Sequence, residues 1–319
     1  SDFVIVFAHW GEEGTFRPND YERTWAQVLA DGGARVPGRT IESHAPKPEQ
    51  IRQPQDVVLY TRDLSFGYDF PLGEHIDLEF HSGEVTALTG RNGVGKSTLG
   101  LTLAGLLKPI AGRVCMADDL VPPHRENNVI TWKSRDLLGR IGMVFQSYDL
   151  FPNKTVLGNI TLAPTLVQKR DKAEVEKEAI ALLERVGLAD RKDAWPHELS
   201  GGQRQRVAIC RALILHPEVL LFDEVTAALD PEMVREVLDV MLELADSGQT
   251  MLIVTHEMQF ARAIADQVIM LEDGGIVEQS DDAEAFFTNP KTERAKRFLH
   301  TFEFDRHRKP AEPTGTSAE

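Results

Sequence analysis

The sequence predicts an α/β fold with a mainly parallel sheet, and two observations lead to this expectation. From Asp56 onward, short apolar runs alternate with glycine loops and with longer stretches whose apolar residues recur at spacings of three and four. That alternation is typical of strands followed by amphipathic helices. The 319 residues are also 42% hydrophobic, which is enough for one large core or two smaller ones.

Five of the apolar runs have the length of buried strands. They cover residues 85–89, 141–145, 219–222, 251–255 and 268–271. Helical patterns lie between them, one built on Val175, Ala179 and Leu183, and a later one on Val237 and Met241. Residues 147–205 contain no strong strand pattern. We therefore expect a helical subdomain there, inserted into a domain that spans residues 57–303.

The two ends of the chain differ in composition from this domain. A stretch rich in Pro and Gln follows the first fifty residues, so residues 1–50 are interpreted as a separate N-terminal piece and residues 51–56 as a linker. The last residues, 304–319, are polar and predict a disordered tail.

Charge and composition exclude several functions. The formal net charge of −15 argues against binding to nucleic acid, which relies on clustered Lys and Arg side chains. No apolar run approaches the roughly 18 residues that span a bilayer, and the first residues do not resemble a signal peptide, so we expect a cytoplasmic protein. Cys115 and Cys210 are the only cysteines, and we expect reduced thiols.

A glycine-rich loop follows the apolar run at 85–89 and precedes a helical pattern. It reads Gly90-Arg91-Asn92-Gly93-Val94-Gly95-Lys96-Ser97, with Thr98 next. In loops of this spacing, backbone N–H groups and a helix N-terminus bind the phosphates of a nucleotide. Lys96 is expected to bind the β- and γ-phosphates, and the Ser97 hydroxyl to bind Mg²⁺. The sequence thus predicts a phosphate-binding loop over residues 90–98.

Two carboxylates, Asp223 and Glu224, end the apolar run at 219–222. Ligands of open α/β sheets bind at the carboxyl ends of the strands, so this pair is a candidate for nucleotide chemistry. By itself an Asp-Glu pair at a strand end is common. Its position shortly after a second motif makes it informative.

That second motif is Leu199-Ser200-Gly201-Gly202-Gln203. Together with the phosphate-binding loop, it resembles the signature of the ABC ATPases. The resemblance implies a P-loop NTPase core with a mainly parallel sheet, a β subdomain and a helical insert, and it implies ATP and Mg²⁺ as cofactors. It also implies that Asp223 binds Mg²⁺ and that Glu224 polarises the water that attacks the γ-phosphate.

The resemblance further implies a second subunit. In the family, the signature of one subunit binds the γ-phosphate of the ATP held by the other. Ser200, Gly201, Gly202 and Gln203 would therefore act across a head-to-tail homodimer. Asp230, in Ala228-Leu229-Asp230, matches the D-loop that crosses to the partner.

Three other residues match family positions. Gln146 matches the Q-loop residue that contacts Mg²⁺ and the attacking water, and His256 matches the switch histidine that contacts the γ-phosphate. Tyr68, 28 positions before Lys96, resembles the aromatic residue that stacks on adenine, with Phe66 as the competing candidate.

The kind of ABC protein is indicated by two pieces. Residues 57–114 resemble the ATPases of energy-coupling-factor vitamin and cobalt importers. Residues 142–300, with Gly-Met-Val-Phe-Gln-Ser-Tyr-Asp-Leu-Phe-Pro at their start, resemble the ATPases of polar amino acid importers of the glutamine and histidine type. In the family the second piece contacts the integral membrane permease. We therefore expect polar amino acid import, powered from the inner face of the cell membrane, with the energy-coupling-factor type as the alternative.

Some features depart from this interpretation. Val225 and Ala227 stand where the family usually has Pro and Ser.

The first fifty residues resemble a fragment of the CapA metallophosphoesterase-like family. This resemblance makes His9, Glu12 and His44 candidate metal ligands of a phosphoesterase, although three scattered candidates do not make a ligand set. The remaining alternative is a nucleotide-binding protein without transport coupling.

Overall fold

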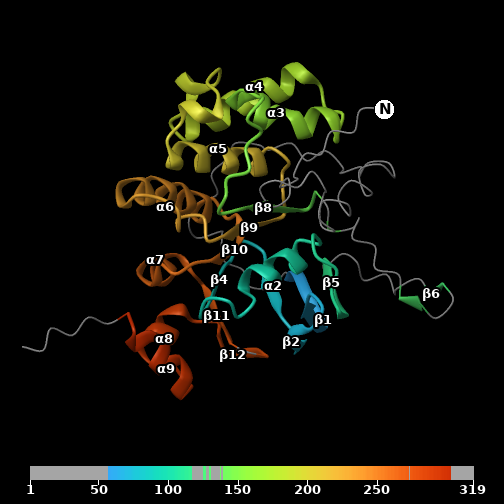
Figure 1. Ribbon diagram of the computed structural model, residues 1–319, viewed down its shortest axis with the longest axis vertical. Coiled ribbons are helices and arrows are strands. Elements are labelled where there is room, and N and C mark those ends of the chain that lie inside the picture. The colour runs from blue at the N-terminus through green and yellow to red at the C-terminus, as the bar shows by residue number, and fades with distance from the viewer. Residues whose placement is uncertain are drawn as a thin grey trace, which may run out of the picture.

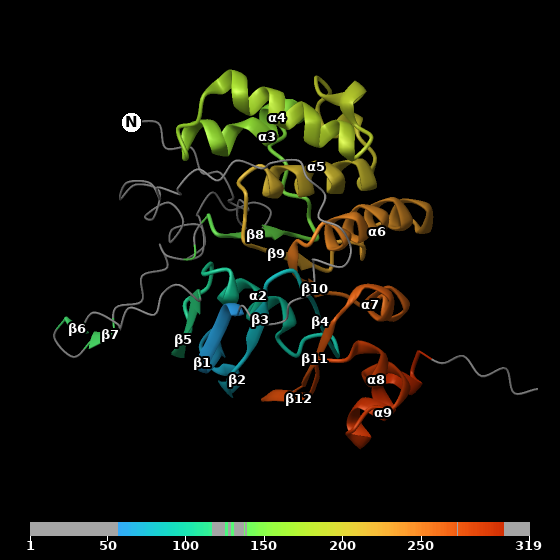
Figure 2. The same ribbon diagram turned by 180° about the vertical axis from the view of Figure 1, so that it is seen from behind.

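The computed structural model describes residues 57–116, 125–126, 129–130, 137, 139–272 and 274–302. The predicted N-terminal piece (1–50), linker (51–56) and tail (304–319) lie outside these residues, as do the candidate ligands His9, Glu12 and His44. Figures 1 and 2 show the described elements from opposite sides.

The larger sheet has the strand order β12-β11-β4-β10-β9-β8. Its strands are β4 (Val85–Gly90), β8 (Ile141–Val144), β9 (Val219–Asp223), β10 (Thr250–Val254), β11 (Gln267–Glu272) and β12 (Gly275–Ser280). Neighbouring strands are parallel except for β12, which is antiparallel to β11. Every predicted apolar run forms one of these strands, which confirms the α/β fold with a mainly parallel sheet.

The smaller sheet is antiparallel. In it β1 (Val57–Gly67) pairs with β2 (Pro71–Ile76), β3 (Glu79–His81) and β5 (Ala111–Met116). A separate two-stranded ladder joins β6 (Arg125–Glu126) to β7 (Val129–Ile130).

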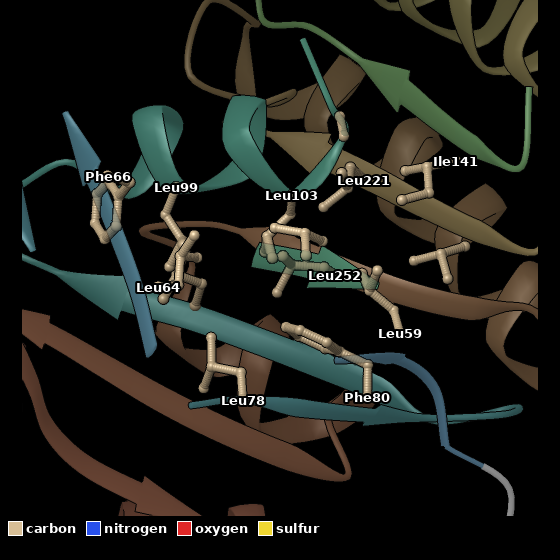
Figure 3. Packing of buried hydrophobic residues seen from close by; sticks show 14 of the residues in the cluster. Leu59, Leu64, Phe66, Leu78, Phe80, Leu99, Leu103, Ile141, Leu221 and Leu252 are labelled. Carbon is tan, nitrogen blue, oxygen red and sulfur yellow. The ribbon is translucent and has the colours of Figure 1, made fainter. Parts of the chain in front are cut away.

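A hydrophobic core fills the space between the smaller sheet, the larger sheet and α2 (Lys96–Leu103). Figure 3 shows side chains from all three meeting in one interior, among them Leu64, Phe80, Leu99 and Leu252. Helix α2 is shorter than its apolar pattern, because the chain turns into the left-handed region at Gly105 (φ +72°). The buried face of α2 thereby fixes the phosphate-binding loop that leads into it.

Helices cover the opposite face of the larger sheet. They are α5 (Gly201–Leu213), α6 (Pro231–Asp246) and α7 (Met258–Ile264), and α5 and α6 contact one another. Val237 and Met241 of α6 are fully buried there against Phe222 of β9, as their spacing predicts. The arrangement holds α5 beside β8, the neighbour of the strand β9 that ends at Asp223 (Figure 2).

The segment before α5 is helical. It contains α3 (Val156–Leu166), α4 (Lys172–Arg185) and the short 3-10 helices η3 (Ala189–Arg191) and η4 (Pro196–Glu198). Helices α3 and α4 pack on α5 and, in both views, lie beyond β8 at one end of the molecule. Val175, Ala179 and Leu183 form the buried stripe of α4.

At the other end, α8 (Ala283–Thr288) and α9 (Glu293–His300) pack beside β12 (Figure 1). Among the described residues, no helix has both the length and the apolar character needed to cross a membrane. Neither cysteine forms a disulfide. Cys115 is half-buried, and burial raises the pKa of the Cys210 thiol to about 12, so Cys210 remains protonated at neutral pH.

Candidate functional site

The phosphate-binding loop joins β4 to α2. Gly95 is the N-cap residue of α2 and has φ +99°, a left-handed conformation that glycine adopts without steric cost. Gly93 also has a positive φ, and a Cβ added there would meet no atom within 4 Å, so space lies beside the loop. Arg91 and Asn92 are exposed, whereas Val94 and Thr98 are buried and anchor the two ends of the turn.

Lys96 is almost completely buried, with 4% of its surface exposed. Its Nζ donates hydrogen bonds to the carbonyl oxygens of Gly90 (3.2 Å) and Arg91 (3.0 Å) and lies 3.7 Å from Glu224 Oε1. Burial lowers the pKa of this ammonium, and the carboxylates of Glu224 and Asp223 oppose that shift. The charge therefore lies inside the loop, next to the helix N-terminus, where phosphate oxygens would bind.

The next residue, Ser97, donates a hydrogen bond of 2.8 Å from its Oγ to Asp223 Oδ1. Burial raises the pKa of Asp223, and the Ser97 hydrogen bond opposes the shift. A hydroxyl and a carboxylate at this separation fit Mg²⁺, which binds few protein ligands and completes its shell with phosphate oxygens and water. The described residues hold no group of three or more His, Cys, Asp or Glu arranged for a metal ion, so a site provided by protein ligands alone is absent from them.

Glu224 lies at the centre of the site. Its Oε1 is 2.8 Å from His256 Nε2 and faces Lys96, and its backbone N–H donates to Val254 O. With φ +47°, Glu224 has a left-handed backbone that is uncommon for a non-glycine residue and is often found at functional sites. The turn directs this carboxylate away from the path of β9, into the site.

The register of the sheet explains why residues far apart in sequence meet here. Val254 of β10 pairs with Leu88 of β4 on one side and with Asp223 of β9 on the other. The three parallel strands therefore end together, and the segments that follow them begin at one edge. The structure brings together five predicted residues: Lys96, Ser97, Asp223, Glu224 and His256.

Gln146 follows β8, the neighbour of β9, and its side chain is exposed. No hydrogen bond joins it to Ser97 or Asp223 within the described part of the chain. The next residues are held by α5, because Arg211 donates to the carbonyl oxygens of Tyr148 and Asp149. Both accepting residues have positive φ. The segment after Gln146 is thus fixed to the helix that follows the signature.

The aromatic candidates separate by burial. Phe66 is completely buried in the core between the sheets (Figure 3), which excludes it from stacking on a base. Tyr68 is 62% exposed in the turn between β1 and β2. Phe70, in the same turn, is 66% exposed and was not identified from the sequence, although an aromatic residue two positions from Tyr68 could have drawn attention to it. Leu72 links this hairpin to the phosphate-binding loop, because its Cβ lies 3.2 Å from the position of a Cβ on Gly95.

The signature opens α5. Ser200 is its N-cap residue, and Ser200 and Gln203 form a reciprocal capping box: Gln203 N–H donates to Ser200 Oγ, and Ser200 N–H donates to Gln203 Oε1. This explains why the helix begins at Gly201. Asp230 likewise precedes α6, with Pro231 at the first helical position.

The two departures from the family pattern leave this geometry intact. Val225 is 4% exposed and packs in the core on the face of α5 and α6. Ala227 donates its N–H to Glu224 O, closing the turn that carries the catalytic candidate. Neither residue replaces a group that contacts Lys96, Ser97 or His256.

Comparison with known proteins gives matches over this same region. The family model described as ABC transporter matches residues 74–227. The glutamate transport ATP-binding protein GluA of Corynebacterium glutamicum is 51% identical over 231 residues, which cover 72% of this chain and 93% of that protein. The glutamate/aspartate import ATP-binding protein GltL of Escherichia coli K12 is 49% identical over 221 residues, covering 69% of this chain and 89% of that protein.

Solved structures agree. The structure of cbiO1 from Clostridium perfringens, part of the ABC transporter complex cbiONQ, has a TM-score of 0.63 and 31% identity, covering 78% of this chain and all of that one. The dimeric ATP-binding cassette MJ0796 bound to ADP and Pi has a TM-score of 0.58 and 29% identity, covering 70% of this chain and 97% of that one. The chain therefore belongs to the ABC transporter family, as an ATP-binding cassette ATPase.

Proposed function

We propose that this chain is the subunit that binds and hydrolyses ATP to power an ABC importer of polar amino acids. The observation that carries the proposal is the meeting of Lys96, Ser97, Asp223, Glu224 and His256 at one sheet edge, beside a phosphate-binding loop. Such a set supplies both parts of phosphoryl transfer, a fixed positive charge for the phosphates and a carboxylate for the attacking water.

Each residue has a separate task in this proposal. The backbone N–H groups of residues 90–98 and the Lys96 ammonium bind the β- and γ-phosphates. Ser97 and Asp223 would hold Mg²⁺, together with Gln146, which follows β8; the bound ion would neutralise charge on the phosphate oxygens. Tyr68 provides the exposed face on which adenine stacks.

Hydrolysis needs a positioned water and an acceptor for its proton. Glu224 polarises the water and takes its proton, and His256, whose Nε2 lies 2.8 Å from Glu224 Oε1, keeps this carboxylate oriented toward the water. Ser200, Gly201, Gly202 and Gln203 of a second copy close the site, and Asp230 crosses between the subunits. The dimeric structure of the cassette MJ0796 supports the pairing of two copies.

The solute class rests on similarity. Relatives at 46–51% identity include glutamate, glutamine, arginine and cystine importer ATPases. The cbiO1 structure favours the energy-coupling-factor alternative, but its identity of 31% is lower. We therefore propose that the chain docks as a homodimer on the cytoplasmic face of an integral membrane permease for polar amino acids.

The proposal is tested by the mass of Glu224→Gln protein in light scattering, with and without Mg²⁺ and ATP. Slowing hydrolysis should trap the closed pair, so the mass should double with Mg²⁺-ATP and return to that of a monomer with ADP. If the variant binds ATP and remains a monomer, the proposed function is contradicted, and the chain is a nucleotide-binding protein that does not power transport. The solute is then identified in vesicles that carry the permease, by ATP-dependent uptake of glutamate, glutamine and cobalt in parallel.

A further inference from the structure

The first turn of α5 has one donor whose acceptor is unusual. The Gln203 N–H is satisfied by Ser200 Oγ, as in an ordinary N-cap. The Gly202 N–H, one of the four amides at a helix start that lack a helical acceptor, points at the sulfur of Met233, 3.4 Å away. Met233 belongs to α6, thirty-one positions further along the chain.

The side chain of Met233 also lies directly on the signature glycines. A Cβ on Gly202 would be 3.0 Å from Met233 Cβ, and a Cβ on Gly201 would be 3.9 Å from Met233 Sδ and 2.9 Å from Leu229 Cδ2. Leu229 and Met233 flank Asp230. The D-loop and the first turn of α6 therefore cover the signature of their own chain.

A thioether is a weak hydrogen-bond acceptor. It satisfies a buried amide, because an unmade bond there would cost free energy, yet it is displaced more readily than a carboxylate or a carbonyl would be. A phosphate oxygen is charged, and its hydrogen bonds to amides are roughly twice as strong as neutral ones. Met side chains have three rotatable bonds, so the sulfur can withdraw without movement of the backbone.

We infer that Met233 is a positioning residue of the signature: its sulfur holds the Gly202 amide in the nucleotide-free subunit and gives it up to the phosphate of the partner's ATP. The inference rests on the proposed function, in which the signature acts across the dimer. The strength of the Met233 sulfur as an acceptor then helps to determine how readily two ATP-loaded subunits pair.

Two substitutions of similar length change the acceptor in opposite directions. Met233→Leu nearly keeps the volume and removes the acceptor, whereas Met233→Gln offers an amide oxygen, which is stronger than sulfur. In the Glu224→Gln background, we expect Met233→Leu to tighten Mg²⁺-ATP-dependent pairing and Met233→Gln to weaken it. A change of about threefold in binding affinity at each signature gives a change of about ninefold in the dissociation constant of a pair, because each pair contains two signatures.

The dissociation constant of the pair is measured by sedimentation equilibrium, with Met241→Leu as the matched control. Met241 is in the same helix and is fully buried in the core, away from the signature. We expect the control to leave the pairing constant unchanged. The amide resonance of Gly202 in nucleotide-free protein provides an independent readout, and it should shift in Met233→Leu and not in Met241→Leu.

Opposite shifts of the pairing constant support the inference. Equal constants in both Met233 variants, or weaker pairing in both, overturn it, and so does an unshifted Gly202 amide in Met233→Leu. If the Glu224→Gln parent does not pair with Mg²⁺-ATP, the proposed function fails and this inference fails with it, a result distinct from the others. If Met233→Gln does not fold, Met233→Leu and the Gly202 resonance decide.

Discussion

The phosphate-binding loop and the signature are both proposed to bind phosphate, yet their donors face different kinds of group. In the loop, charged groups face one another: Lys96 lies 3.7 Å from Glu224, and Ser97 donates to the carboxylate of Asp223. In the signature, the donors meet neutral groups, since Gly202 faces the Met233 sulfur and Gln203 faces the Ser200 hydroxyl.

This difference in the groups that the donors face indicates where each region obtains its phosphate ligand. The loop contains a buried cation that needs opposite charge at all times, and the carboxylates at the end of β9 supply that charge until phosphate binds. The signature contains dipoles without a full charge, so neutral acceptors satisfy it until a second subunit brings the phosphate. Removing a charge from the loop should therefore have much larger effects than changing the signature.

The largest effect is expected for Lys96→Ala. This change removes the ammonium that balances the γ-phosphate and leaves Glu224 without its cation, so ATP turnover should fall by about 10²–10³-fold. Phosphate release is measured at saturating Mg²⁺-ATP, with Lys172→Ala, an exposed cation of α4, as the control. Turnover of Lys96→Ala within tenfold of the wild type would contradict the role of the loop.

Asp223→Asn should lower Mg²⁺-dependent turnover, by less than Lys96→Ala does, and stabilise the fold at neutral pH. Burial raises the pKa of Asp223, so its contribution to stability is present below the unfolded pKa of 3.8 and is lost as the pH rises through the folded pKa. Mg²⁺ needs the ionised carboxylate. In the wild type, Mg²⁺-dependent ATP affinity should decrease as the pH falls through that raised pKa.

Two measurements follow this behaviour. Thermal unfolding should give a higher Tm for Asp223→Asn than for the wild type at pH 7, with the gap closing at acid pH. A fluorescent ATP analogue should show no pH-dependent Mg²⁺ effect in the variant. A lower Tm at pH 7 would mean that the hydrogen bond from Ser97 outweighs the burial of the charge.

Substitution of Phe66 should affect stability, whereas substitution of Tyr68 should affect base binding. Phe66→Ala removes a fully buried ring and should cost about 3–5 kcal/mol of unfolding free energy. Tyr68→Ala should leave stability nearly unchanged and weaken ATP binding by about 1–3 kcal/mol, while inorganic tripolyphosphate binds as before. Urea titration and competition binding measure the two quantities. Equal losses for ATP and tripolyphosphate would place Tyr68 outside the base site.

The smallest effect is expected for the signature cap. Ser200→Ala and Thr155→Ala each remove an N-cap hydroxyl, from α5 and α3, and each should cost about 1 kcal/mol of stability. Only Ser200→Ala should also lower ATP turnover, by roughly tenfold. Comparing the loss of turnover with the loss of stability in these two variants therefore tests whether the Ser200 hydroxyl contacts phosphate. Equal turnover in both variants would show that this hydroxyl only caps a helix.

Much of the fold and site could be predicted, because local patterns determine them. The five buried strands are continuous apolar runs, Lys96 and Ser97 belong to the phosphate-binding loop, and Asp223, Glu224 and His256 were predicted from the resemblance to the ABC ATPases. The choice between Tyr68 and Phe66 could not be made from sequence. It depends on where β1 ends: Phe66 lies within β1 and is buried in the core, whereas Tyr68 follows Gly67, the last residue of β1, and lies in the exposed turn.

Other features depend on contacts between distant segments. The sulfur of Met233 meets Gly202 only because α6 packs on α5. In the sequence, the spacing of Met233 from the other apolar residues of α6 indicates only a core residue of an amphipathic helix. The left-handed backbone of Glu224 likewise reflects its hydrogen bond to Val254 O on another strand. The CapA-like N-terminal piece and the tail lie outside the described residues, and their roles stay predictions.

In the proposed dimer, the loop of one subunit and the signature of another form one site. This shared site is tested by mixing two inactive variants, Lys96→Ala and Ser200→Arg, each first checked for folding. In a mixed dimer, one of the two sites combines the intact loop of the Ser200→Arg subunit with the intact signature of the Lys96→Ala subunit. We predict that turnover reappears on mixing, at about a quarter of the wild-type value for random pairing. A mixture as inactive as its components would contradict a site shared between subunits.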